Sequence, residues 1–221
     1  MESPRDVYLA SCQEISRRFE GAGFRYAKSG PRFSRGDVDF KYTVSFQSSV
    51  YNIAGQHVRL WMYAGVGSKA LMALRKAHLP EKMVTDYAAG GMAQNLLGRS
   101  RPVVEWDLAD PSTRHAKILE VVAFLNDNII PYFDMFLRPG DLVDRLIAED
   151  VPAMDFPSSL EFALCYRGED AARLVLAGFQ ERRRDLLPEI ERIENEGLKS
   201  PHIGPSGYAE QVVYYRRSYN L

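Results

Sequence analysis

The clearest structural signal in the sequence is "VDFKYTVSFQSS", which runs from Val38 to Ser49. Between Phe40 and Phe46 apolar and polar residues alternate strictly, which is the period of a strand with one buried face. The apolar positions are Phe40, Tyr42, Val44 and Phe46, and the polar positions are Lys41, Thr43, Ser45 and Gln47. The sequence therefore predicts a half-buried strand whose polar side faces solvent, a pocket or a partner.

Further strand patterns lie on both sides of this stretch. Upstream, residues 24–28 and 32–35 predict a hairpin with its turn at Ser29-Gly30-Pro31, and residues 6–20 predict a helix before it. Downstream, "HVRLWMYAGVG" (57–67) predicts another strand, and Ser68 predicts the cap of a following helix. We interpret "DYAAGGMAQNLLGRS" as a loop or broken helix because of its glycine pair, and residues 101–108 as one more strand.

From Asp110 the apolar spacing changes to that of helices. Pro131 is expected to kink or end the first of them, and Ser158 with Glu161 predicts a capping box at the start of a later one. The predicted class is α+β: an N-terminal helix and an antiparallel β-meander of four to five strands, followed by a helical C-terminal half. We expect residues 1–110 to form the sheet region and residues 111–221 the helical region, packed as one compact unit.

The composition is that of a globular protein, with 46% hydrophobic and 26% charged residues and a formal charge of −1. This balance argues against a dedicated nucleic-acid or membrane-surface binder. The first residues contain no secretory signal, no apolar run approaches the length of a membrane helix, and two distant cysteines favour neither disulfides nor a zinc site. A cytoplasmic protein is the expectation.

Charge is nevertheless segregated along the chain. Residues 1–70 hold ten Lys or Arg against six Asp or Glu, a surplus of four positive charges. Residues 141–170 hold eight acidic residues against two arginines, a surplus of six negative charges. We interpret the second segment either as an acidic face or as the solvated sides of helices.

The strand predicted at 57–67 has large side chains on both of its faces. Val58, Leu60, Met62, Ala64 and Val66 share one face, and His57, Arg59, Trp61 and Tyr63 share the other. A covering helix would explain the second face as packed side chains. A partly open binding surface would explain it as well, because amphipathic aromatic residues and arginine are favoured interface anchors.

No catalytic set emerges from the motifs. Asp39 and Lys41 have the acid-x-Lys spacing of metal-dependent nucleases, but residues 21–36 supply no second acid, and Glu105 and Asp107 would have to approach from a distant strand. "AGVGSKA" (64–70) has the wrong order for a phosphate loop, and the four histidines form no metal-binding pattern. We predict no catalytic residue, no cofactor and no metal.

Five segments together resemble a bacterial family of unknown function, the "four-three-zero-four" type. They are "GFRYAKSGPRFSR", "YTVSFQSSVYN", "VRLWMYAGVGS", "NDNIIPYFDMF" and "DLVDRLI", and the resemblance covers about residues 14–147. It implies a small bacterial protein, in some cases encoded beside toxin or secretion genes. It implies no activity.

The leading hypothesis is a protein-binding module, such as an immunity or antitoxin-like protein that neutralises a basic toxin. Its candidate contacts are Arg59, Trp61, Tyr63, Asp141, Asp144, Glu149 and Asp150. The alternative is a small-ligand-binding protein or enzyme with a pocket between sheet and helices, lined by Gln47, Ser49, His57 and Arg59. A third hypothesis is a homo-oligomer formed through the aromatic tail "YAEQVVYYRRSY".

Overall fold

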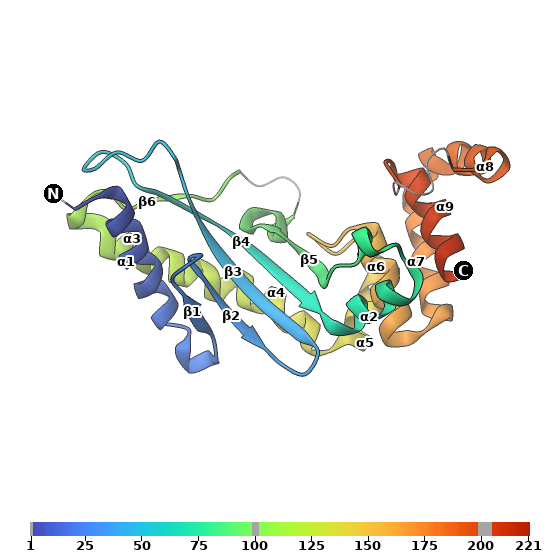
Figure 1. The fold of residues 1–221 in the computed structure, drawn as a ribbon, viewed down its shortest axis with the longest axis horizontal. Helices are drawn as coiled ribbons and strands as arrows, with labels where there is room; N and C mark the ends of the chain where they lie inside the picture. Colours follow the sequence, from blue (N-terminus) through green and yellow to red (C-terminus); the bar gives the residue numbers. More distant parts are fainter. Residues whose placement is uncertain (1, 99–101, 199–204) are drawn as a thin grey trace. The chain divides into compact units, whose positions relative to one another are not determined.

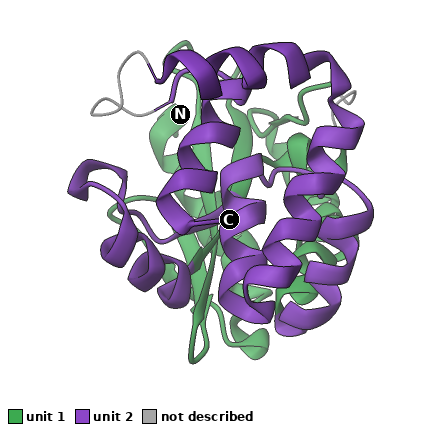
Figure 2. Ribbon diagram, turned by 90° about the vertical axis from the view of Figure 1, so that its right-hand side faces the viewer, with its two compact units in different colours: residues 1–67, 90–136 green, residues 68–89, 137–221 purple. Residues whose placement is uncertain are grey.

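The structure is a computed structural model that describes residues 2–98, 102–198 and 205–221. The chain divides into two compact units, which Figure 2 colours separately. Unit 1 comprises residues 1–67 and 90–136, and unit 2 comprises residues 68–89 and 137–221. The predicted division at residue 110 stays a prediction, because compactness alone does not show which segments fold independently.

A sheet in the spatial order β1-β2-β3-β4-β5 dominates unit 1, and a short strand β6 also pairs with β4 (Figure 1). The strands are β1 (Arg25–Ala27), β2 (Arg32–Gly36), β3 (Phe40–Ser48), β4 (Arg59–Ser68), β5 (Tyr87–Met92) and β6 (Trp106–Asp107). Together with the helices on either side of it in the sequence, this meander confirms the predicted α+β class.

The predicted strand around Val38–Ser49 is β3, and its alternation is realised in three dimensions. Phe40, Tyr42, Val44 and Phe46 are buried, whereas Lys41 is exposed. The turn before the strand is held by the Asp37 carboxylate, which accepts hydrogen bonds from the backbone N–H groups of Asp39 and Phe40. Antiparallel pairing of β2 with β3 sets Phe33 opposite Val44 and therefore on the same buried face.

Helices of unit 1 cover that buried face: α1 (Pro4–Arg17), α3 (Pro111–Phe124) and α4 (Ile130–Asp134). Aromatic rings fill the space between the two layers. The Phe133 ring lies 5.3 Å from the Tyr42 ring, and the Phe24 ring lies 5.2 Å from the Phe33 ring. Each fully buried ring of this kind contributes roughly 1.5–3 kcal/mol to stability, so these contacts fix which side of the sheet becomes the core.

Two predicted elements need correction. The segment interpreted as a loop or broken helix contains β5, because strand pairing here requires the glycine that made it look irregular. A Cβ on Gly90 would stand 2.6 Å from the Ala64 carbonyl oxygen and 2.8 Å from the Gly65 Cα, so only glycine permits the close approach of β5 to β4. The strand predicted at 101–108 covers only Trp106 and Asp107, and its first residue lies outside the described residues.

Pro131 does not end the helical run in which it lies. After α3, residues Leu125–Ile129 form one wider π turn, and α4 follows directly. The Ile130 N–H donates to the Leu125 carbonyl oxygen across that turn. Proline has no N–H to donate, and a widened turn is a common way for a helix to accommodate such an interruption.

Unit 2 is mainly helical. Its helices are α2 (Lys69–His78), α5 (Pro139–Ala148), α6 (Phe156–Arg167), α7 (Glu169–Arg182), α8 (Leu187–Glu196) and α9 (Tyr208–Tyr219). Helix α6 contacts α2, α5, α7 and α9, so it is the centre of the unit. Ser68 accepts a hydrogen bond from the Leu71 N–H, which confirms the predicted cap of α2.

The predicted capping box of α6 is wrong. The helix begins at Phe156, and its cap is Asp155, whose carboxylate accepts a hydrogen bond from the Ser158 N–H at 2.9 Å. Glu161 is one turn further into the helix and fully buried, where its carboxylate binds Arg75. The Glu161 side chain, which the local pattern assigned to the helix end, therefore forms a tertiary ion pair instead.

Candidate functional site

The side of the sheet turned away from the helices of unit 1 is the first candidate site. In Figure 1, β2, β3 and β4 lie in front of α3 and α4, so this side faces the viewer. It carries Arg25, Arg32, Ser34, Lys41, Thr43, Ser45, Gln47, Arg59, Trp61 and Tyr63, which we call the open face. Their neighbours in sequence along β3 and β4 are buried.

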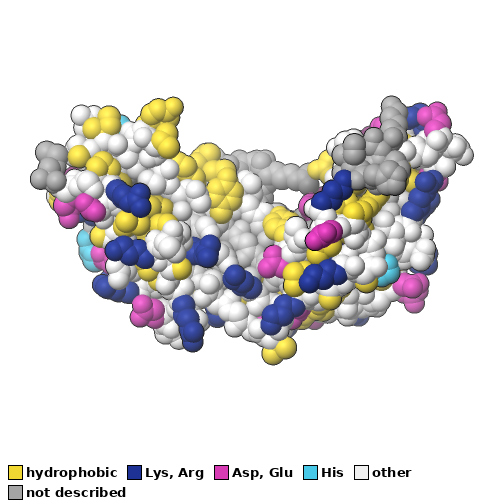
Figure 3. Space-filling view, in the orientation of Figure 1, with side chains coloured by type: hydrophobic (Ala, Val, Ile, Leu, Met, Phe, Trp, Pro, Cys, Tyr) yellow, Lys and Arg dark blue, Asp and Glu magenta, His cyan; other side chains and the backbone are white. Residues whose placement is uncertain are grey.

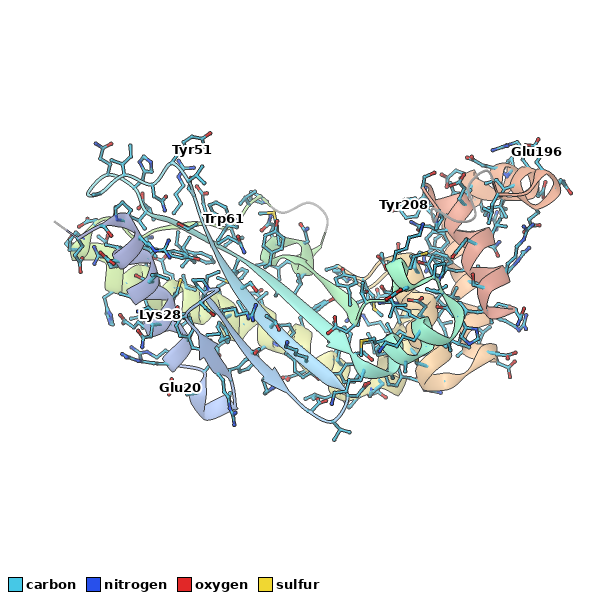
Figure 4. All side chains as sticks on the ribbon, viewed as in Figure 1. Glu20, Lys28, Tyr51, Trp61, Glu196 and Tyr208 are labelled. Carbon is cyan, nitrogen blue, oxygen red and sulfur yellow. The ribbon has the colours of Figure 1, made fainter. Side chains whose placement is uncertain are left out.

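The aromatic residues of the open face lie where the strand pattern placed them. Leu60, Met62 and Ala64 point into the core, so Trp61 and Tyr63 of β4 point away from it. Tyr63 is 44% exposed, Trp61 is partly exposed, and Arg59 is exposed. Figure 4 shows Trp61 on β4. These two aromatic side chains are therefore not core residues.

Cations without acidic partners flank these aromatic residues. Pairing of β2 with β3 and with β1 places Arg32 opposite Ser45, and Ser34 opposite both Thr43 and Arg25. Among the described residues, no carboxylate lies within ion-pair distance of Arg25, Arg32 or Lys41. Figure 3, in the orientation of Figure 1, shows Lys and Arg side chains gathered over the strands. The open face is therefore cationic.

Arg59 differs from these three cations because acids lie beside it. Its guanidinium is 3.5 Å from the Glu105 carboxylate, and β6 pairing sets Asp107 opposite it. The Asp107 carboxylate accepts hydrogen bonds from the backbone N–H groups of Val58 and Ala109, both at 2.9 Å. Glu105 and Asp107, the two acids considered for a nuclease site, therefore contact β4 and stabilise its pairing with β6.

No group of three or more His, Cys, Asp or Glu suited to a metal ion occurs in the described part of the chain.

A second candidate site is a cavity of about 450 Å³ in unit 1, which we call the end cavity. Three segments enclose it: the first turns of α1, the β1–β2 turn and the end of β3. Its lining residues are Ser3, Pro4, Arg5, Tyr8, Leu9, Lys28, Ser29, Pro31, Ser48, Ser49, Val50 and Asn52. A neighbouring cavity of about 370 Å³ shares Tyr8, Pro31 and Ser48 with it and adds Arg32, Ser45 and Gln47.

The predicted pocket residues are therefore only partly brought together. Ser49 lines the end cavity and Gln47 lines its neighbour. His57 lines neither of these two cavities, and its Nε2 hydrogen-bonds the Tyr51 carbonyl oxygen within the loop between β3 and β4. Sequence reasoning missed Arg5 and Lys28, since cations so far apart in sequence form no motif. The positive surplus of residues 1–70 was the only signal.

The acidic segment of unit 2 has its charges opposed. Asp144 lies 2.8 Å from Arg167, and Asp150 lies 3.2 Å from Arg182. The remaining predicted contacts pair in the same way, Asp141 with Arg138 and Glu149 with Arg145. Of the other acids in the segment, Asp155 caps α6 and Glu169 lies 3.6 Å from Arg173. The surplus counted along the sequence is thus largely neutralised by arginines within unit 2.

Unit 2 also contains a buried ion network centred on Arg75, which is 5% exposed, and Glu161, which is 0% exposed. Arg75 Nε donates to Glu161 Oε2 at 2.8 Å, and the Tyr219 hydroxyl donates to Glu161 Oε1 at 2.5 Å. The remaining donors of Arg75 reach the carbonyl oxygens of Thr85 and Tyr87 and the Ser158 hydroxyl. Burial raises the pKa of the Glu161 carboxyl, and the hydrogen bonds from Arg75 and Tyr219 oppose that shift.

This network is a structural element rather than a reactive one. All its charged atoms have partners, which is the condition under which a buried ion pair is tolerated. It joins α2, α6, α9, Thr85 and the first residue of β5. The aromatic tail forms part of the same core: Val212, Tyr215 and Tyr219 are buried, and only Tyr208 of the predicted stripe is exposed.

Cys12 offers no activated thiol in this structure. Cys12 is buried in α1, and burial raises the pKa of its thiol far above the usual range, which leaves it protonated and unreactive. Cys165 lies in α6 and is partly buried. Within the described residues, no helix has the length and apolarity that crossing a membrane demands.

Comparisons with known proteins gave no match, since neither a protein-family model, nor a curated protein, nor a solved structure resembles the chain significantly. The resemblance to a bacterial family of unknown function therefore stays a prediction.

Proposed function

We propose that this protein is a protein-binding module whose open face covers an acidic surface of a partner. The observation that carries the proposal is the combination, on one uncovered sheet face, of Tyr63 and Trp61 with the unopposed cations Arg25, Arg32 and Lys41. Aromatic anchors supply contact area at low entropic cost, and cations around them supply orientation and association rate.

The charges of the candidate surfaces favour an acidic partner over a basic one. The acidic residues proposed as contacts, Asp141, Asp144, Glu149 and Asp150, already pair with arginines of the same unit. A basic toxin would have to compete with those arginines. The open face has no such competition at its three unopposed cations, so complementary charge there would act on the partner directly.

An immunity or antitoxin role remains part of this proposal. Such a protein acts by covering the active surface of its partner and needs no catalytic group of its own. We place it in the cytoplasm, where its two cysteines, far apart in sequence, would stay reduced. The partner in this proposal is then a toxin or other protein with an acidic surface rather than a basic one.

The test is capture of a partner from extracts of the native host by the immobilised full chain, followed by binding measurements with the purified partner. We expect Tyr63→Ala to weaken binding about 30-fold, the effect of losing an interface hot spot of about 2 kcal/mol. Arg32→Glu should slow association and reduce its dependence on salt.

Tyr208→Ala is the matched control, because Tyr208 has nearly the same exposed fraction, 46%, and lies in unit 2. It should bind the partner as the unaltered chain does. A captured protein that binds the Tyr63→Ala and Arg32→Glu variants with unchanged affinity would refute the proposal, as would recovery of no stoichiometric protein partner.

A second candidate function, binding of a small ligand, is favoured by a different observation: the end cavity. Its volume falls within the range of roughly 300–1,000 Å³ that is typical of small-molecule sites. It lies at the edge of the sheet and includes Ser49.

A further inference from the structure

We propose that the end cavity binds a small phosphate monoester with an apolar or aromatic body. The site would be distinct from the partner contacts of Tyr63 and Trp61, because neither residue lines the cavity. The proposal rests on the charge of the lining, on its hydroxyl groups and on its apolar wall.

The charge of the lining is +2. Arg5 and Lys28 are exposed cations, and the lining residues include no Asp or Glu. Figure 4 labels Lys28, which follows β1 and begins the β1–β2 turn. Within the described part of the chain, neither cation has a carboxylate at ion-pair distance. The nearest acid in sequence, Asp6, is held by Ser3, whose hydroxyl donates to the Asp6 carboxylate at 2.6 Å.

Two hydroxyl groups in the lining are prepared to donate. The Ser48 Oγ accepts a hydrogen bond from the Asn52 side-chain amide at 2.8 Å, and the Ser49 Oγ accepts one from the Tyr51 N–H at 3.1 Å. Each oxygen accepts only one of these hydrogen bonds through a lone pair, so its own hydrogen is available to donate to another acceptor. An anion in the cavity would meet these donors together with Ser29 and the two cations.

A dianion fits this set better than a monoanion. Two cations balance the two charges of a phosphate monoester near neutral pH, and several donors match its three terminal oxygens. Arg5 also lies in the first turn of α1, where the helix dipole disfavours a cation, so its position there is not explained by helix stability. Binding of an anion would offset that unfavourable interaction.

The rest of the lining indicates what the phosphate is attached to. Pro4, Leu9, Pro31 and Val50 form an apolar wall, and the ring of Tyr8 lies among them. A free inorganic phosphate would leave this wall in contact with water. An organic body of the size of one aromatic ring would bury it, and burial of apolar surface favours binding.

The experiment is calorimetric titration of the full chain with phenyl phosphate, the simplest phosphate monoester with an aromatic body. Saturable binding with one site is expected, and Arg5→Gln and Lys28→Gln should each weaken it about tenfold or more, because each removes a charge-assisted contact. Benzoate, a monoanion of similar shape, should bind at least about tenfold more weakly than phenyl phosphate.

Arg17→Gln is the matched control: it removes the same charge from the other end of the same helix and should leave binding unchanged. Absence of saturable binding by the unaltered chain would overturn the proposal. Equal weakening by Arg17→Gln would also overturn it, since it would show attraction by net charge alone. Equal binding of benzoate would refute the assignment of a dianion. A variant of the open face, Tyr63→Ala, should bind phenyl phosphate normally, so this test and that of the proposed partner surface can fail independently.

Discussion

Both units contain ion pairs, but they differ in the charges that their candidate surfaces leave without a partner. Unit 2 brings acids and arginines together, both at its surface, as for Asp144 with Arg167, and in its interior, as for Glu161 with Arg75. Unit 1 leaves Arg25, Arg32 and Lys41 on its open face, and Arg5 and Lys28 at its end cavity, without a carboxylate in reach among the described residues.

This difference distinguishes charges that hold the fold from charges left for another molecule. A charge in an intramolecular ion pair already has its partner in the fold, and removing it costs stability in proportion to its burial. An unpaired exposed cation adds little to stability, yet it creates a field that a binding partner can complete. The contrast can therefore be tested by measuring stability, beginning where the effect is largest.

Replacement of Arg75 by methionine should produce the largest loss. It would leave the Glu161 carboxylate buried without its cation and the Thr85 and Tyr87 carbonyl oxygens without their donor. Removal of one member of a buried ion pair typically costs about 3–5 kcal/mol. We expect a decrease of this size in the free energy of unfolding, measured with urea at pH 7.

The double variant Arg75→Met, Glu161→Leu is the control for this interpretation. It removes both charges, so no buried carboxylate is left unpaired, and much of the lost stability should return. A double variant as unstable as the single one would show that the shape of the side chains, rather than their charge, maintains this core.

The strands were predictable because their signal is local. The alternation from Phe40 to Phe46 fixes both the strand and the side that is buried, and no distant residue is needed to read it. The same holds for Ser68, whose cap acts three residues along the chain. Gly90 was misread because its role depends on how closely β5 approaches β4, which a glycine pair in the sequence does not reveal.

The candidate sites were less predictable because they depend on pairing over long distances. The acids at 141–170 were counted as a free negative surface, but Arg167 and Arg182 come back to Asp144 and Asp150 from other helices. Glu161 fitted a capping box by spacing, and its true partner, Arg75, is 86 residues away. Tyr63 and Trp61 were placed correctly on one face, because that placement follows from the strand period alone.

Tyr219→Phe should have an intermediate effect. It deletes the hydroxyl that donates to Glu161 Oε1 and should lower the free energy of unfolding by about 1–3 kcal/mol at pH 7, the cost of an unsatisfied buried group. Burial, the charge of Glu161 and this hydrogen bond all raise the pKa of Tyr219 above its usual value.

The raised pKa of Tyr219 gives this prediction a pH dependence. Above about pH 10, the unfolded chain releases the tyrosine proton while the folded chain keeps it, so stability falls as the pH rises. Tyr219→Phe should make that fall shallower, as followed by urea unfolding from pH 8 to pH 11. An unchanged slope in Tyr219→Phe would contradict the burial of this hydroxyl in the folded state.

The smallest effect is expected on the open face, and it tests directly whether the cations of that face contribute to folding. Lys41→Gln removes a cation with no acid in reach among the described residues, so the free energy of unfolding should change by less than about 0.5 kcal/mol. In unit 2, Arg167→Gln breaks the exposed pair with Asp144 and should cost up to about 1 kcal/mol at low salt, less at high salt. Urea unfolding at two salt concentrations measures both. A loss in Lys41→Gln as large as that in Arg167→Gln would mean that the open face uses its charges for folding, and its cations would then no longer argue for a partner.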